Sequence, residues 1–219
     1  MNDSEIVKET IVFVKETLRG AEGGHDWFHI QRVFNNTLLL AKEENVSILV
    51  VSLAALLHDI ADAKFHDGDE RIGPILANNF LKSLNVDNNV VTHVIKIIEN
   101  MSFKNSLEKG KKSFISKELQ VVQDADRLDA IGAIGIARAF NYGGFKNREL
   151  YNPAMAPNLT MTKEEYKKST APTINHFYEK LLLLKDKMNT NTGKKIAEQR
   201  HEFMLNYLKQ FYGEWHGEL

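Results

Sequence analysis

The sequence predicts an all-α protein, a compact bundle of packed helices. Apolar residues recur at the three- and four-residue spacing of helices in one segment after another. The strict alternation that is typical of strands persists nowhere in the chain. Residues 48–57 are apolar on every side, as in a helix that other helices surround. We therefore expect one domain over residues 1–219, with a core region at about 20–140 and a C-terminal helical part at about 160–219.

The composition supports a soluble, cytoplasmic protein. The 219 residues, 43% of them hydrophobic and 26% charged, are enough to bury a substantial core. A net charge of −1 creates no overall positive field that would favour nucleic acid or an anionic membrane. The absence of cysteine excludes disulfides, zinc–cysteine sites and thiol nucleophiles, and it fits a reducing compartment. The N-terminal stretch mixes acids and lysines through its apolar positions, unlike a signal peptide, and the longest apolar run is too short for a membrane-spanning helix.

Helices in the first half follow from caps and periodicity. Asp3 or Ser4 can cap a first helix that runs to about Leu18, where a glycine-rich stretch ends it. Apolar residues at helical spacing then predict helices at about 26–44, 48–57, 73–84 and 86–101.

The second half is expected to hold three longer helices. Ser116 and Glu118 can open the first, whose apolar and small residues continue to about Tyr142. Pro172 suits the first position of another helix. The predicted segments are about 116–142, 172–188 and 194–212, with a short helix capped by Thr162 and Glu165 between the first two.

Aromatic residues recur at helical spacing in the C-terminal third of the chain. Such residues are more often packing surface than a platform on which a base stacks, and we expect packing here. His176 and Lys180, one helical turn apart, are candidates to line a pocket. The aromatic residues are Phe177, Tyr178, Phe203, Tyr207, Phe211 and Trp215.

Side chains that can bind a metal gather in three clusters, each on or beside a predicted helix. The clusters are HDWFH at 25–29, the His58-Asp59 pair, and QDADRLD at 123–129. Imidazoles and carboxylates without a thiolate suit Mn²⁺, Fe²⁺, Mg²⁺ or Ni²⁺ better than structural zinc. A histidine and a carboxylate at the buried end of the 48–57 helix must be hydrogen-bonded, paired or coordinated. The spacing does not choose among Asp124, Asp126 and Asp129.

In their order, these clusters resemble the HD superfamily of metal-dependent phosphohydrolases. The family pattern is a histidine, then a His-Asp pair, then a distant aspartate, and it matches HIQRV at 29–33, LLHDIADAK at 56–64 and DADRLDAIG at 124–132. The resemblance implies a bundle of helices with the metal near its centre. It also implies one divalent ion, with Mn²⁺ favoured over Mg²⁺, Fe²⁺ or Ni²⁺. The implied ligands are His29, His58, Asp59 and Asp126.

Neighbouring residues acquire roles from the same resemblance. Asp62 matches an acid that orients or deprotonates the attacking water; a solvated helix-end carboxylate is the alternative for Asp62. Lys64, just past the same motif, is the second catalytic candidate, a cation expected to grip the substrate phosphates. His25 and Asp26 are expected to cap the second helix and to hydrogen-bond near the site, so His25 joins the substrate-binding candidates. The other cations assigned to substrate phosphates are Lys104, Arg71 and Arg127, with Lys111, Lys112 and Arg138 also available.

Three further residues bear on the number of metal ions and on how the ligands are held. A second metal would need additional histidines, for which His66 and His93 are the candidates. We favour a site with one metal, because a lone histidine on an apolar helix, such as His93, is usually packed in a core. Arg32, one turn after His29, could hold an acidic ligand in place.

The function implied is metal-dependent hydrolysis of a small phosphorylated substrate. A nucleotide is favoured, including cleavage of a nucleoside triphosphate to the monophosphate and pyrophosphate. A phosphodiesterase or 5′-nucleotidase acting at the same site is one alternative, and a non-catalytic sensor that binds metal and nucleotide is another. We expect neither nucleic acid nor membrane as a partner, and the sequence leaves the oligomeric state open.

Overall fold

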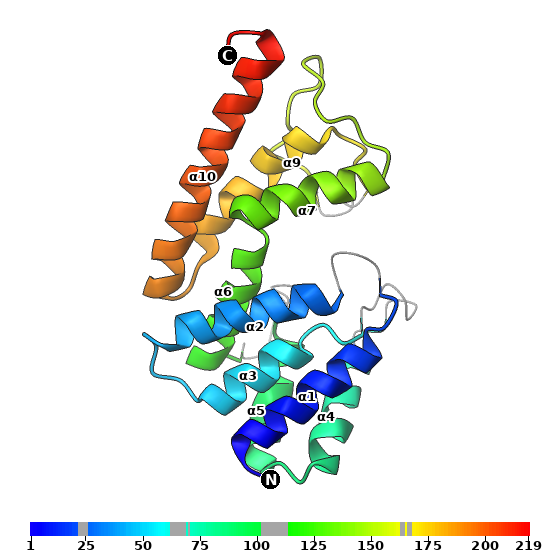
Figure 1. The fold of residues 1–219 in the computed structure, drawn as a ribbon, viewed down its shortest axis with the longest axis vertical. Coiled ribbons are helices and arrows are strands. Elements are labelled where there is room, and N and C mark those ends of the chain that lie inside the picture. Colours follow the sequence, from blue (N-terminus) through cyan, green and yellow to red (C-terminus); the bar gives the residue numbers. More distant parts are fainter. Residues whose placement is uncertain (22–25, 62–68, 70, 102–113, 163–164, 166–167) are drawn as a thin grey trace. The chain divides into compact units, whose positions relative to one another are not determined.

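The computed structural model is helical in every described element, which confirms the all-α prediction (Figure 1). It describes residues 1–21, 26–61, 69, 71–101, 114–162, 165 and 168–219. Over these residues the chain forms two compact units, Met1–Asp126 and Arg127–Leu219. The expectation of a single domain stays a prediction. Within the described part, we find no helix with both the length and the hydropathy needed to cross a bilayer.

In its described residues, the first unit contains five helices and the beginning of a sixth. The cap of its first helix is not the one predicted: Asn2, rather than Asp3 or Ser4, accepts a bond from the Glu5 N–H at 3.0 Å. The Glu5 carboxylate in turn accepts a bond from the Asn2 N–H at 2.8 Å, which completes a capping box. The helices are α1 (Asp3–Thr17), α2 (Trp27–Ala41), α3 (Ile48–Leu57), α4 (Ile72–Ser83), α5 (Asn88–Glu99) and α6 (Lys117–Asp129), whose last residues enter the second unit.

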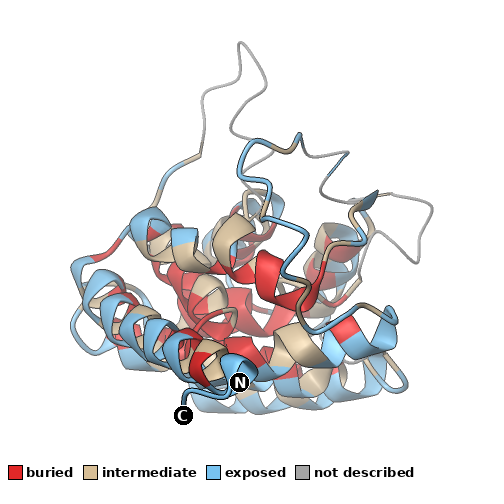
Figure 2. Cartoon of the chain, turned by 90° about the horizontal axis from the view of Figure 1, so that it is seen from above, coloured by how far each residue is buried: buried red, intermediate tan, exposed pale blue. Residues whose placement is uncertain are grey.

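Helix α3 is the centre of the first unit, as the sequence predicted. It packs against α1, α2 and α5, and every residue from Val50 to Leu57 is buried. Figure 2 shows such buried segments in red, with exposed helix faces in pale blue. The helix ends at Leu57, and His58 is its C-cap. Residues 59–61 form a turn and a bend, and Asp62 lies outside the described residues.

The prediction of a single helix at 116–142 is wrong, because the chain turns a corner between α6 and α7 (Gly132–Phe145). Ile131 is extended, and Gly132 has a φ of +75°, which side chains rarely adopt. A Cβ on Gly135 would collide with the Ala130 carbonyl. The small residues that continue the helical spacing are therefore the residues that permit the corner.

The second unit contains α7, α9 (Thr173–Glu179), the 3₁₀ helix η3 (Leu181–Lys187) and α10 (Asn191–His216). The prediction of one helix at 172–188 is wrong, because the backbone at Lys180 (φ −145°, ψ −56°) separates α9 from η3. Pro172 is the N-cap of α9 rather than its first helical residue. The predicted capping pair is present, since Thr162 and Glu165 exchange reciprocal backbone–side-chain hydrogen bonds.

Aromatic side chains pack α7, α9 and α10 together. The rings of Phe140, Phe177 and Tyr207 lie with centroids 6.0–6.1 Å apart, and Phe177 is fully buried. This confirms the packing role predicted for Phe177 and Tyr207. Phe203 and Trp215 are instead about half exposed.

Candidate metal centre

His29 is positioned by the start of α2. Asp26 is the N-cap of this helix, and its Oδ1 accepts a hydrogen bond from the His29 N–H at 2.9 Å. This bond fixes the first turn of α2, from which the His29 side chain projects, and that side chain is only 3% exposed. Asp26 thus has the capping role expected from the sequence, while His25 lies outside the described residues.

His58 is oriented by the last turn of α3. Its Nδ1 lies 2.8 Å from the Ala55 carbonyl oxygen. A carbonyl can only accept, so Nδ1 carries the proton and Nε2 presents its lone pair on the other side of the ring. Nε2 is also the atom of His58 that faces Asp126, at 4.0 Å.

Asp126 enters from α6, which Asn36 ties to α2. The Asn36 amide donates to the Ala125 carbonyl at 3.3 Å, next to Asp126 in the chain. Asn36 follows His29 by two helical turns and is buried, so one face of α2 carries both the histidine and the bond to α6. The sequence analysis missed this role, although a polar residue on the apolar face of α2 was a usable signal. Nothing in the sequence marks the Ala55 carbonyl.

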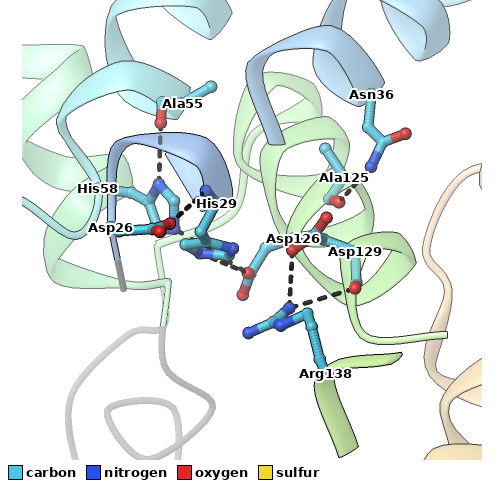
Figure 3. Close-up of polar contacts among 9 residues, drawn as sticks. All are labelled: Asp26, His29, Asn36, Ala55, His58, Ala125, Asp126, Asp129 and Arg138. Carbon is cyan, nitrogen blue, oxygen red and sulfur yellow. Dashed lines mark hydrogen bonds and ion pairs between the residues drawn. The ribbon is translucent and has the colours of Figure 1, made fainter. Parts of the chain in front are cut away.

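The side chains of His29, His58 and Asp126 converge in the first unit (Figure 3). One potential ligand atom from each lies within 4.8 Å of the other two. His29 Nε2 is 3.6 Å and His58 Nε2 is 4.0 Å from Asp126 Oδ1, which is too long for direct hydrogen bonds. Two atoms that each lie about 2.1 Å from a common cation are roughly 3–4.2 Å apart. The spacing of these donors therefore fits a divalent ion.

The three donor side chains differ in solvent exposure. The His58 side chain is 6% exposed and the Asp126 side chain 43% exposed. The two imidazoles therefore lie in the interior of the first unit, while the carboxylate reaches solvent. A cation held by these donors would be approachable by solutes from the side of Asp126.

Asp59 lies beside this group in the chain and is half-buried. Among the described residues, the converging group contains His29, His58 and Asp126 without Asp59. Its role as a ligand stays a prediction.

The other two aspartates left open by spacing, Asp124 and Asp129, are almost completely buried. Asp129 Oδ2 accepts a hydrogen bond from Arg138 Nη1 at 2.7 Å, and the same nitrogen donates to the Asp129 carbonyl at 3.1 Å. Arg138, a predicted phosphate-binding candidate, is thus bound to an acid of its own unit (Figure 3).

Two of the remaining predicted cations form polar contacts of their own in the described part of the chain. Arg71 forms a two-pronged bond with Asp69, at 2.9 and 2.8 Å, and this carboxylate raises the pKa of the guanidinium. Arg127 donates to the Lys187 carbonyl at 2.8 Å within the second unit. The candidates that lie outside the described residues are Asp62, Lys64, His66, Lys104, Lys111 and Lys112.

His93 and Arg32 lie on the helices where they were expected. His93 Nε2 is 3.0 Å from Ser116 Oγ and 3.6 Å from the Glu118 carboxylate, and His93 is not in the converging group. Its polar contacts differ from the apolar packing that the sequence suggested. Arg32 is half-buried one turn after His29, and its role beside an acidic ligand stays a prediction.

Replacing Asp26 tests whether it caps α2 or binds the metal. Asp26→Ala should lower the free energy of unfolding by about 1 kcal/mol, because it removes the bond to the His29 N–H. Asp26→Ser should restore most of that loss, since serine is a good N-cap. Metal affinity, measured by calorimetric titration, should change less than about fivefold in the serine variant, whereas a ligand role would make both variants lose the metal.

Comparison with known proteins agrees with the motifs. Residues 27–131 match the HD domain family. A crystal structure of an HD-superfamily hydrolase from Bacillus thuringiensis is 41% identical, covers 98% of this chain and 99% of its own, and has a TM-score of 0.79. Bacillus subtilis YpgQ, in a crystal structure in complex with ADP, is 36% identical, covers 98% and 97%, and has a TM-score of 0.77. A predicted HD superfamily hydrolase from an uncultured Thermotogales bacterium is 26% identical, with 98% and 99% covered and a TM-score of 0.63. The chain therefore belongs to the HD superfamily, as its relatives from Bacillus thuringiensis and the Thermotogales bacterium do.

Proposed function

We propose that the protein is a metal-dependent phosphohydrolase that acts on a nucleotide. The observation that carries this proposal is the convergence of His29, His58 and Asp126 from three helices. With Asp59 added from the HD motif, these residues would hold one divalent ion, for which Mn²⁺ is our first candidate. Such an ion lowers the pKa of a bound water and offsets charge on a phosphoryl group.

The residues of the chain would prepare this chemistry in distinct ways. The Asp26 cap fixes the backbone that carries His29, and the Ala55 carbonyl sets the tautomer of His58, so its Nε2 would be ready to bind. The exposed Asp126 carboxylate supplies negative charge on the side that solutes reach. Asp62, as in the family pattern, would orient the attacking water or take its proton.

A nucleotide is the favoured substrate because of two independent considerations. The family resemblance implies a small phosphorylated molecule, and the related YpgQ structure contains ADP. We propose that a nucleoside triphosphate is cleaved to the monophosphate and pyrophosphate.

A product assay separates this proposal from its alternatives. Protein stripped of metal with EDTA and then supplied with Mn²⁺ would be incubated with nucleoside tri-, di- and monophosphates and with a phosphodiester. The proposal expects pyrophosphate and monophosphate from triphosphates. Inorganic phosphate from monophosphates would indicate a nucleotidase and hydrolysis of the diester a phosphodiesterase. Binding without any product would indicate a sensor.

Asp62→Ala tests the role assigned to this acid. We expect turnover to fall about a hundredfold, since a positioned acid–base group typically contributes at least that much. The affinity for Mn²⁺ should be retained, because Asp62 is not one of the proposed ligands. Asp62→Asn is the matched control, which keeps the side-chain volume while removing the base. A fully active alanine variant would show that Asp62 has no part in the reaction.

A further inference from the structure

The start of α6 is bonded to the start of α3. Glu118, in the first turn of α6, uses its Oε1 to accept a hydrogen bond from the Ser47 N–H at 3.2 Å. Ser47 is the N-cap of α3, and its Oγ accepts a bond from the Val50 N–H at 3.4 Å. A carboxylate is favourable at this point, because the N-terminus of a helix carries partial positive charge. Glu118 therefore interacts with the first turns of two helices at once.

The other carboxylate oxygen of Glu118 faces α5. Its Oε2 lies 3.6 Å from His93 Nε2, and the same nitrogen lies 3.0 Å from Ser116 Oγ. The Ser116 hydroxyl also accepts a bond from the Leu119 N–H at 3.0 Å, which caps α6. The Glu118 side chain is only 17% exposed, so water screens these contacts little. The beginning of α6 is thus held by α3 and α5 together.

The opposite ends of α3 and α6 carry metal donors. His58 is the C-cap of α3, Asp126 lies in the last turn of α6, and the two side chains face each other at 4.0 Å (Figure 3). Because the starts of these helices meet and their ends meet, α3 and α6 run in the same direction. The helix rises by about 12 Å from Glu118 to Asp126. A shift of α6 along its axis at Glu118 would therefore reach Asp126.

We propose that Glu118 is a positioning residue for the metal centre, which sets the register at which Asp126 meets His58. Each ligand atom must lie about 2.1 Å from the ion, so a displacement of Asp126 by a fraction of a helical turn would take its carboxylate out of reach. The Asn36 bond to the Ala125 carbonyl holds the end of α6 to α2, whereas Glu118 holds its start to α3. This role rests on the proposed metal centre and does not depend on which substrate is hydrolysed.

Calorimetric titration of the full chain with Mn²⁺ tests this role. Glu118→Ala should weaken Mn²⁺ binding about tenfold, the lower end of what residues that orient metal ligands contribute. Glu118→Gln should stay within about threefold of the wild type, because its side-chain oxygen can still accept the Ser47 N–H.

Ala77→Gly is the matched control for a general loss of stability. Ala77 is fully buried in α4, which carries none of the three donors, and glycine weakens a helix interior. Denaturant unfolding should show that Glu118→Ala and Ala77→Gly are both less stable than the wild type, while Ala77→Gly keeps wild-type affinity for Mn²⁺. The electron paramagnetic resonance spectrum of bound Mn²⁺ should change in Glu118→Ala, since one ligand has moved, and stay unchanged in Ala77→Gly.

Three results would overturn the positioning role. They are wild-type Mn²⁺ affinity in Glu118→Ala, a Glu118→Gln variant as weak as Glu118→Ala, and an equal loss of affinity in Ala77→Gly. Failure of the metal centre itself has a different signature. Wild-type protein would then bind no Mn²⁺, which would remove both the centre and the role of Glu118.

Discussion

Replacing Asp126 with alanine is expected to abolish tight binding of Mn²⁺ and to reduce nucleotide hydrolysis at least a thousandfold. The Asp126 carboxylate is the anionic member of the converging group, and it faces both imidazoles, at 3.6 and 4.0 Å. Without it, the proposed ligand set keeps only the Asp59 carboxylate to offset the charge of the cation. A thousandfold loss corresponds to about 4 kcal/mol of transition-state stabilisation, within the range that a catalytic metal supplies.

Metal titration by calorimetry and a pyrophosphate assay would be run on the same Asp126→Ala preparations. Asp186→Ala removes an exposed carboxylate from the second unit and is the matched control. It should bind Mn²⁺ and turn over as the wild type does. An Asp126→Ala protein that bound Mn²⁺ with wild-type affinity would remove this carboxylate from the proposed centre.

Replacing Asp129 with alanine is expected to destabilise the second unit by about 3–5 kcal/mol. Asp129 is 1% exposed and bonded to Arg138 at 2.7 Å, so truncation removes the buried carboxylate that offsets the charge of this guanidinium. The substitution should also remove a favourable interaction of Arg200. Burial lowers the pKa of this guanidinium, and the Asp129 carboxylate acts in the opposite direction. Metal affinity should be far less affected than in Asp126→Ala.

Denaturant unfolding can be followed in each unit separately. The chain has two tryptophans, Trp27 in the first unit and Trp215 in the second, so Trp27→Phe leaves a reporter for the unit that contains Asp129. The control is the double variant Asp129→Leu/Arg138→Met, which removes both charges and should recover much of the lost stability. Equal unfolding midpoints for wild type and Asp129→Ala would show that the buried pair contributes nothing.

The three aspartates of the last motif show how far sequence reasoning reaches. Periodicity identifies buried positions, and burial would favour Asp124 or Asp129, which are the two buried acids. The acid that meets the histidines is Asp126, whose side chain is 43% exposed. This carboxylate reaches solvent, so a pattern that reports only buried positions cannot select it. The family motif could select Asp126, because it depends on the order of residues along the chain.

The helical segments were predictable wherever an apolar period and a cap agreed. The pattern failed at the corner after Ala130, since apolar and small residues keep the same spacing through Gly132 and Gly135. Only the left-handed φ of Gly132 and the close approach at Gly135 distinguish the corner from a continuing helix. The break at Lys180 likewise has no glycine or proline to announce it.

The absence of a polar side on α3 has a consequence for how the centre assembles. A ten-residue helix is too short to persist in water by itself, and this one offers solvent no hydrophilic surface from Val50 to Leu57. It can become ordered only when α1, α2 and α5 close around it. The place of His58 therefore depends on this packing, and truncating α1, which contributes no donor, should weaken the proposed metal site through the loss of α3 packing.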